Sequence, residues 1–182
     1  MMKNKKNQLD HFLASVEKRA FQMTRLATGD ADEALDIVQD SMLYLAKKYP
    51  QHNEAEWRPL FYRILQNKIK DWYRKKKTIS RWRVWLGMGN NNDDERDPLD
   101  TIADPKGITP ENATEAGTLR AMIYNALAGL PLRQQQAFLL RAWEEFDTRE
   151  TAAIMNCSEG SVKTHYSRAI SHLKKSLEGL WS

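Results

Sequence analysis

The C-terminal part of the chain carries polar and cationic side chains along one face of a predicted helix. Apolar residues recur at three- and four-residue steps from Val162 to Leu177, which predicts a helix with one buried stripe. The other face carries side chains that can donate hydrogen bonds to phosphates and to base edges: Lys163, Thr164, Ser167 and Arg168. Side chains of these types on an exposed helix are suited to the major groove of duplex DNA.

The residues before this helix predict the first half of a helix-turn-helix. Asp147 and Glu150 have the spacing of a capping box, which starts a short helix. Asn156 tolerates the left-handed conformation in which such a helix ends, and Ser158 can cap the next one. Taken alone, the stretch could also be a solvated helical hairpin with a basic face, so the rest of the chain must decide between the two interpretations.

A second cationic surface is predicted on a helix spanning residues 57–77. Apolar residues from Trp57 to Trp72 repeat at helical spacing and predict a buried face. A different face carries a cationic stripe at steps of three or four residues, which consists of Arg63, Asn67, Lys70, Arg74 and Lys77 and is widened by Lys68, Lys75 and Lys76. Such a stripe matches a phosphate backbone and predicts salt-dependent binding. The neighbouring aromatic side chains either stack on unpaired bases or belong to the core: Trp57, Tyr62, Trp72 and Tyr73.

A third surface is predicted on a helix that runs from about residue 30 to 49. Its expected buried face consists of Leu35, Val38, Met42, Leu45 and Tyr49. A separate face, at steps of three and four residues, carries Asp36, Gln39, Asp40 and Leu43. Polar side chains beside an exposed leucine are either solvated surface or a docking site for a basic partner.

The elements that position these surfaces predict an all-α protein with two small helical domains. Residues 1–77 form the N-terminal helical domain, which also contains a helix over residues 9–27. Residues 78–115 are expected to be a flexible linker, because glycine, proline and acidic residues replace the apolar periodicity. Residues 116–182 form the C-terminal helix-turn-helix domain. Its core is expected to include Leu119, Met122, Ile123, Ala126, Leu127, Ala137, Phe138, Leu140 and Trp143.

Composition limits the function classes. The 182-residue chain has a formal net charge of +4, a modest bias toward polyanionic partners. A single cysteine, Cys157, excludes an intrachain disulfide framework and fits a reducing compartment. No apolar run follows the basic N-terminus and none is long enough to span a membrane, so we expect neither a signal peptide nor stable membrane insertion. A cytoplasmic location is the expectation.

Three stretches in this order resemble the extracytoplasmic-function (ECF) sigma factors of bacterial RNA polymerase, specifically the sigma-E type. Residues 36–40, Asp-Ile-Val-Gln-Asp, are similar to the family's core-binding segment. Residues 60–67, Leu-Phe-Tyr-Arg-Ile-Leu-Gln-Asn, are similar to its promoter-melting segment. Residues 130–134 and 160–164 resemble its C-terminal domain. Each stretch is weakly specific alone, but together they are highly specific.

The resemblance implies a transcription initiation factor that binds core polymerase, directs it to promoters with −10 and −35 elements and helps to melt the DNA. Asp36, Gln39, Asp40 and Leu43 would dock on the polymerase clamp helices, and the flap would be a further contact. The −10 element would be engaged by Arg63, Asn67, Lys68, Lys70 and Arg74, and the −35 element by Lys163, Thr164, Ser167 and Arg168. An anti-sigma factor is a further partner that the resemblance implies.

Other function classes account for less of the chain. A LuxR-type transcription regulator has a similar helix-turn-helix at residues 161–165, but it leaves the N-terminal half without a role. An enzyme is not expected, because no nucleotide-binding glycine loop and no Ser-His-Asp or Cys-His arrangement stands out. His165, His172 and Cys157 are too few for a structural zinc site, so no metal or cofactor is expected. A pure interaction module would not explain two basic surfaces.

Overall fold

In the computed structural model, which describes residues 2–86 and 115–178, the chain is built from helices packed around one large hydrophobic cluster and a smaller one. The N-terminal block consists of α1 (Met2–Thr28), α2 (Ala31–Lys48) and α3 (Glu54–Trp85). The C-terminal block consists of α4 (Glu115–Ala128), α5 (Leu132–Phe138), a π-helical segment η2 (Leu139–Trp143), α6 (Thr148–Met155) and α7 (Glu159–Ser176). Among the described residues there is no strand, in agreement with the predicted all-α class.

Local sequence signals begin and end the N-terminal helices. Gly29, at φ +69°, ends α1 in the left-handed region, and its N–H donates to the Arg25 carbonyl oxygen at 2.8 Å. The Asp30 carboxylate then accepts hydrogen bonds from the Asp32 and Glu33 amides and caps α2. α3 begins three residues earlier than the expected Trp57, because Asn53 and Glu56 form a reciprocal capping box.

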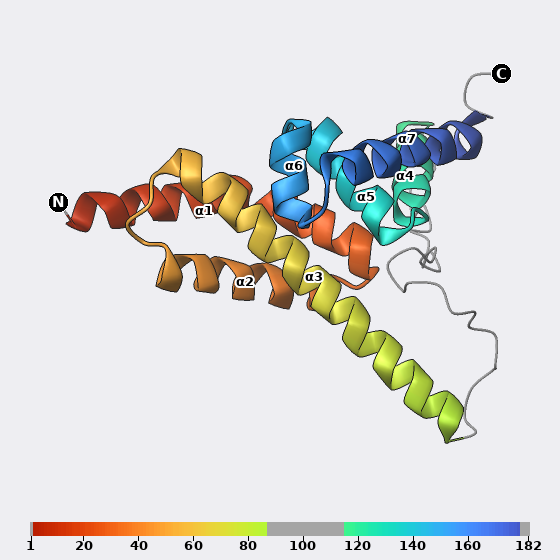
Figure 1. The fold of residues 1–182 in the computed structure, drawn as a ribbon, viewed down its shortest axis with the longest axis horizontal. Coiled ribbons are helices and arrows are strands. Elements are labelled where there is room, and N and C mark those ends of the chain that lie inside the picture. Colours follow the sequence, from red (N-terminus) through yellow and green to blue (C-terminus); the bar gives the residue numbers. More distant parts are fainter. Residues whose placement is uncertain (1, 87–114, 179–182) are drawn as a thin grey trace.

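α3 is longer than the sequence pattern predicted. It continues to Trp85, although the expected helix ended at Lys77 and the expected linker began at residue 78. Residues 78–86 contain no proline and no glycine, so nothing in them breaks a helix, and Thr78 donates to the Arg74 carbonyl oxygen within the helix. Figure 1 shows these last turns projecting away from the other helices. Residues 87–114, the rest of the expected linker, lie outside the described residues.

The aromatic side chains of α1 and α3 form the centre of the N-terminal block. Phe12 contacts Trp57 and Phe61 at ring-centroid distances of 5.9 and 6.2 Å, and Phe61 contacts Tyr62 at 5.4 Å. Trp57, Phe61 and Tyr62 are fully buried. Trp57 and Tyr62 are therefore core residues, which decides against base stacking by either of them. In α2, Leu35 is exposed and Ala34 is buried in its place, so the predicted buried face was wrong at that residue.

The two blocks share one hydrophobic core in this structure. Their buried side chains form a continuous cluster that includes Phe61 and Tyr62 from α3 and Ile154 and Met155 from α6. Helix α6 packs directly on α3, and α4 packs on α1 (Figure 1). The expected C-terminal core was wrong at its first helix: Leu119, Met122 and Ile123 of α4 are exposed, because α4 lies at the edge of the block. Ala137 and Leu140 are buried as predicted.

Candidate nucleic-acid and polymerase interface

The helix-turn-helix forms with the capping residues that the sequence predicted. Asp147 accepts from the Glu150 amide at 2.7 Å, and the Glu150 carboxylate accepts from the Asp147 amide at 2.8 Å. Asn156 ends α6 at φ 54° and ψ 54°, and Ser158 accepts from the Ser161 amide at 3.1 Å as the cap of α7. These caps fix α6 and α7 relative to each other, so α7 presents a defined outer face.

The four predicted contact residues on α7 all lie on that outer face. Val162, Ala169 and Leu173 are buried, whereas the opposite side of the helix is exposed at Lys163, Thr164, Ser167 and Arg168. Cys157, in the turn, is half-buried, and burial raises the pKa of its thiol. The turn cysteine is therefore a packing residue rather than an activated thiolate. The arrangement leaves one face of α7 free to enter a groove of DNA.

The cationic stripe on α3 divides into three parts. Arg63, Asn67 and Arg74 are exposed and share the outer side of the helix. Lys68 turns toward α2, where its Nζ lies 3.8 Å from an Asp40 carboxylate oxygen. Lys70 turns toward the C-terminal block and is half-buried; burial lowers its pKa, and the neighbouring Arg133 lowers it further. The structure thus brings three of the five predicted residues together on one open surface.

The predicted docking face on α2 is exposed at all four of its residues: Asp36, Gln39, Asp40 and Leu43. Leu43 is 55% exposed, and two further exposed apolar side chains, Leu35 and Tyr44, lie on the same helix. Leu43 therefore adds an exposed apolar side chain to a face that is otherwise polar and acidic. The ion pair between Asp40 and Lys68 links this face to α3.

One set of residues that joins the two blocks was not predicted from the sequence. Gln136 of α5 donates to the Gln66 side-chain oxygen of α3 at 2.7 Å, and both residues are buried. Gln135 donates to the Leu26 carbonyl oxygen at 3.3 Å and to the Leu127 carbonyl oxygen at 2.9 Å. The available signal was the run of three glutamines in the short helix α5, because buried amides need specific partners.

The second link between the blocks is ionic. Glu144, which follows η2, is buried against α3, where Arg58 Nη2 lies 3.2 Å from its carboxylate and also donates to its backbone carbonyl oxygen. Arg19 of α1 lies 3.8 Å from the same carboxylate oxygen. Phe146 contacts the Tyr62 ring at 5.5 Å, and the Arg58 guanidinium lies 4.1 Å from the Phe146 ring centroid.

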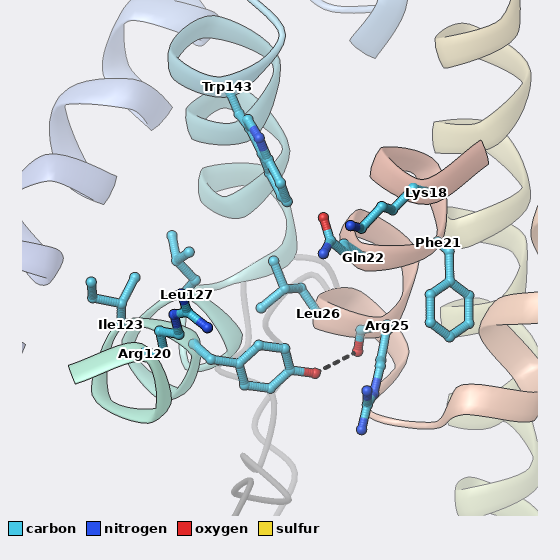
Figure 2. Close-up of a pocket in the computed structure, with 10 residues that line it drawn as sticks. Lys18, Phe21, Gln22, Arg25, Leu26, Arg120, Ile123, Leu127 and Trp143 are labelled. Carbon is cyan, nitrogen blue, oxygen red and sulfur yellow. Dashed lines mark hydrogen bonds between the residues drawn. The ribbon is translucent and has the colours of Figure 1, made fainter. Parts of the chain in front are cut away.

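A groove of about 590 Å³ runs between α1 and α4, with Trp143 at one end (Figure 2). Its walls are mostly apolar, and Figure 2 shows Leu26 and Leu127 between the two helices. Three cations stand at its edges: Lys18, Arg25 and Arg120. The Tyr124 hydroxyl donates to the Arg25 carbonyl oxygen at 3.3 Å and joins the helices across the groove. A groove of this kind favours an acidic amphipathic partner over a neutral apolar ligand.

Residues 2–86 and 115–178 contain neither a metal-binding cluster nor a membrane-spanning helix. No group of three or more His, Cys, Asp or Glu side chains in this part of the chain is placed to hold a metal ion. No helix among the same residues is long and apolar enough to cross a membrane.

Comparison with known proteins accounts for both blocks. Residues 9–79 match the family model described as Sigma-70 region 2, and residues 120–173 match the model described as Sigma-70, region 4. The first match assigns the N-terminal half to a sigma-factor region, whereas the hypothesis of a LuxR-type regulator leaves that half without a role.

Individual relatives agree with these matches. An RNA polymerase sigma-E factor of Streptomyces antibioticus is 29% identical over 64% of this chain and 54% of its own length. An RNA polymerase sigma-E factor of Streptomyces coelicolor is 24% identical over 93% of this chain and 86% of its own length. A solved structure of the sigma factor RpoE from Bartonella quintana, in complex with the anti-sigma factor NepR, has a TM-score of 0.64 at 21% identity. It covers 97% of this chain and 98% of that one. The chain belongs to the ECF sigma factors of the sigma-70 family and is a transcription initiation factor rather than an enzyme.

Proposed function

We propose that this chain binds core RNA polymerase through α2 and reads promoter DNA with α3 and α7. One observation carries the proposal. The segments that match regions 2 and 4 each present an exposed polar face that is suited to binding polymerase or DNA, while the apolar faces of the same helices are buried. Such work takes place in the cytoplasm, where the polymerase and the chromosome are. The direct test is a promoter-binding assay. Core polymerase should bind promoter fragments stably in the presence of this chain and should not do so in its absence.

The −35 element is assigned to α7. Lys163 and Arg168 supply cations, and Thr164 and Ser167 supply hydroxyls, all on the exposed side of the helix. An arginine or lysine can make two hydrogen bonds to a guanine edge in the major groove, and the hydroxyls can bond phosphates or bases. The buried stripe of α7 packs on the rest of the C-terminal block and holds this face outward.

The −10 element is assigned to α3. Arg63, Asn67 and Arg74 lie on its open surface, and Lys68 lies at the border of that surface. Lys70 is partly covered by the C-terminal block and would add to the surface only if that block moved away. Lys76 lies over the Trp72 ring at 4.4 Å, and Trp72 donates to Glu33, so this tryptophan is held in place beside the surface. Phosphate contacts by these cations would hold the opened strand.

Removal of one of these cations should make DNA binding less dependent on salt concentration. Arg63→Ala should lower the slope of log affinity against log salt by about 0.7, because one fewer phosphate of a single strand is neutralised. The measurement is anisotropy of a labelled promoter strand bound to the polymerase complex at several salt concentrations. Lys48→Ala, an exposed cation in the last turn of α2, is the matched control and should leave the slope unchanged. Equal slopes for wild type and Arg63→Ala would show that Arg63 does not contact a phosphate of the promoter strand.

Polymerase docking is assigned to the exposed face of α2. Asp40→Lys should weaken binding to core polymerase, since it reverses a charge on the docking face. It should leave the melting temperature nearly unchanged, because Asp40 is exposed, Lys68 is partly exposed, and an ion pair at the surface contributes at most about 1 kcal/mol. Asp10→Lys, an exposed carboxylate on α1, is the control for charge. Core affinity that is the same in both variants would exclude this face.

An anti-sigma factor is proposed as the occupant of the groove between α1 and α4. The solved relative is in complex with an anti-sigma factor, and the groove here combines apolar walls with Lys18, Arg25 and Arg120. An acidic amphipathic helix has the complementary face, and the exposed Met122 and Ile123 of α4 extend the apolar surface that it could cover. A partner held there would contact both blocks at once.

A further inference from the structure

The exposed large apolar side chains among the described residues gather on three helices. Some lie on α4, where Met122 and Ile123 extend the groove between α1 and α4. The others lie on α2 and on the last turns of α3: Leu35, Leu43, Tyr44, Ile79, Trp82 and Leu86. Exposed apolar side chains that gather on one helical face are typical of a binding surface. Two such surfaces, one on α2 and one on α3, are therefore present outside the groove.

The α3 end, residues 74–86, is basic and carries one apolar face. Ile79, Trp82 and Leu86 follow one another at steps of three and four residues, so they share a side of the helix. Their side chains are 55%, 59% and 60% exposed. The sequence of the α3 end contains six lysines and arginines and no acidic residue. Because this end projects away from the other helices (Figure 1), it offers a basic amphipathic helix to a partner.

The exposed face of α2 has the opposite charge. Residues 32–40 contain four acidic residues, all of them exposed, and no lysine or arginine. Leu35 and Leu43 lie about two turns apart on the side of α2 that also carries Asp36. This acidic face of α2 is complementary to a basic helix with an apolar face, because opposite charges attract and both apolar surfaces leave water. The α3 end has both of these properties.

The two complementary surfaces of one chain do not meet each other. Helix α2 lies beside the middle of α3, where Lys68 Nζ is 3.8 Å from an Asp40 carboxylate oxygen and Trp72 donates to the Glu33 carboxylate at 2.9 Å. Trp82 lies ten residues beyond Trp72, or about 15 Å further along the same continuous helix. The α3 end thus extends past the start of α2. A second copy of the chain can bring the two surfaces together.

We propose that the α3 end binds the acidic face of α2 in a second copy of this chain, and that the two copies form a symmetric dimer. The dimer itself does not depend on the proposed function, because it can be measured without polymerase or DNA. Its consequence does depend on it. The same face of α2 is proposed to bind core polymerase, so the second copy and the polymerase would compete for it.

A two-fold axis forms both contacts at once, because the α3 end of each copy then lies on α2 of the other. In an antiparallel pair the axis crosses α3 about halfway between Lys68 and Ile79. Since Lys68 lies beside Asp40, this register brings the apolar face of one copy to the level of Asp40 and the residues after it in the other. It also brings Lys75 opposite the part of α2 that contains Asp36. Each contact involves only a few helical turns, so we expect a weak, reversible dimer.

The test uses two charge-reversed variants of the full chain. The first, Asp36→Lys with Asp40→Lys, reverses the acidic face of α2, and the second, Lys75→Glu with Lys76→Glu, reverses the α3 end. Each variant alone should sediment as a monomer at concentrations where the wild type dimerises, because both of its symmetric contacts then pair like charges. An equimolar mixture should dimerise again, because one contact then pairs the original charges and the other pairs the reversed charges. All four positions are exposed, so circular dichroism should show an unchanged helical signal.

Trp82→Ser tests the apolar part of the contact. It should raise the dissociation constant of the dimer about tenfold, because a tryptophan that becomes buried often dominates an interface. Leu119→Ser, which removes an exposed apolar side chain from α4, is the matched control and should leave the constant unchanged.

Sedimentation velocity over concentrations from about 1 to 200 µM covers the range expected for a weak dimer. A wild-type chain that stays monomeric throughout this range would overturn the proposal, and so would a mixture of the reversed variants that does not dimerise. Equal self-association of Trp82→Ser and wild type, with weaker binding of Trp82→Ser to a single-stranded oligonucleotide, would instead make the α3 end a nucleic-acid contact and would also overturn it. A dimer that forms as described but does not compete with core polymerase would support this contact and contradict the docking face proposed on α2.

Discussion

Arg168→Ala is expected to weaken binding to the −35 element by about 1–3 kcal/mol, which is the value of a good bidentate contact between an arginine and a base. Arg168 is exposed on the outer face of α7, and its removal leaves the buried stripe of that helix untouched. Lys163→Ala should act in the same direction and by a similar amount if it contacts a base edge. The measurement is the affinity of the polymerase complex for duplex fragments with and without the upstream element.

The matched control for this prediction is Lys174→Ala, an exposed cation in the last turn of the same helix. It removes the same charge from α7 but lies beyond the predicted contact residues. A base-reading role requires that Arg168→Ala reduce discrimination between matched and mismatched elements, whereas Lys174→Ala should not. If both variants lowered affinity equally for every sequence, α7 would contact only the phosphate backbone.

Phe61→Ala is expected to have the largest effect on stability, with a loss of about 3–5 kcal/mol in the free energy of unfolding. The Phe61 side chain is completely buried, and its ring contacts those of Phe12 and Tyr62. Truncation would leave a cavity at the centre of the N-terminal block, where α1 and α3 meet. Urea unfolding followed by circular dichroism measures the change.

Leu43→Ala is the control for Phe61→Ala. Leu43 is 55% exposed, so its truncation should change the free energy of unfolding by no more than about 0.5 kcal/mol. The same variant should weaken binding to core polymerase, because Leu43 belongs to the proposed docking face. Comparable loss of stability in the two variants would mean that α2 does not expose this face in solution.

Much of the local structure could be predicted because it depends on neighbours in the sequence. The caps at Asp147 and Ser158 and the left-handed end of α6 at Asn156 require only residues within one helical turn, and all three were confirmed. The helix expected over residues 9–27 depends on the same kind of regularity, and it forms as part of α1 with Phe12, Val16 and Ala20 buried. Confirmed, too, is the family that the sequence motifs resembled.

The relation between the blocks could not be predicted, because it depends on contacts far apart in the sequence. Leu35 fits the apolar pattern of α2 but is exposed, since periodicity marks a stripe without fixing its edges. Lys70 belonged to a predicted cationic stripe, yet the C-terminal block packs beside it. The partners of Gln66 and Arg58 lie 70 and 86 residues away, and no local pattern identifies them.

The most direct measurement is transcription in vitro from a library of genomic fragments, with purified core polymerase in the presence and absence of this chain. We predict new start sites that depend on the chain and share sequence elements upstream, near −10 and −35. Asp40→Lys should reduce transcription from all of these start sites. Arg168→Ala should have its largest effect at start sites that depend on the −35 element. Sequence-specific binding of the free chain to duplex DNA, with no new start sites, would contradict the account.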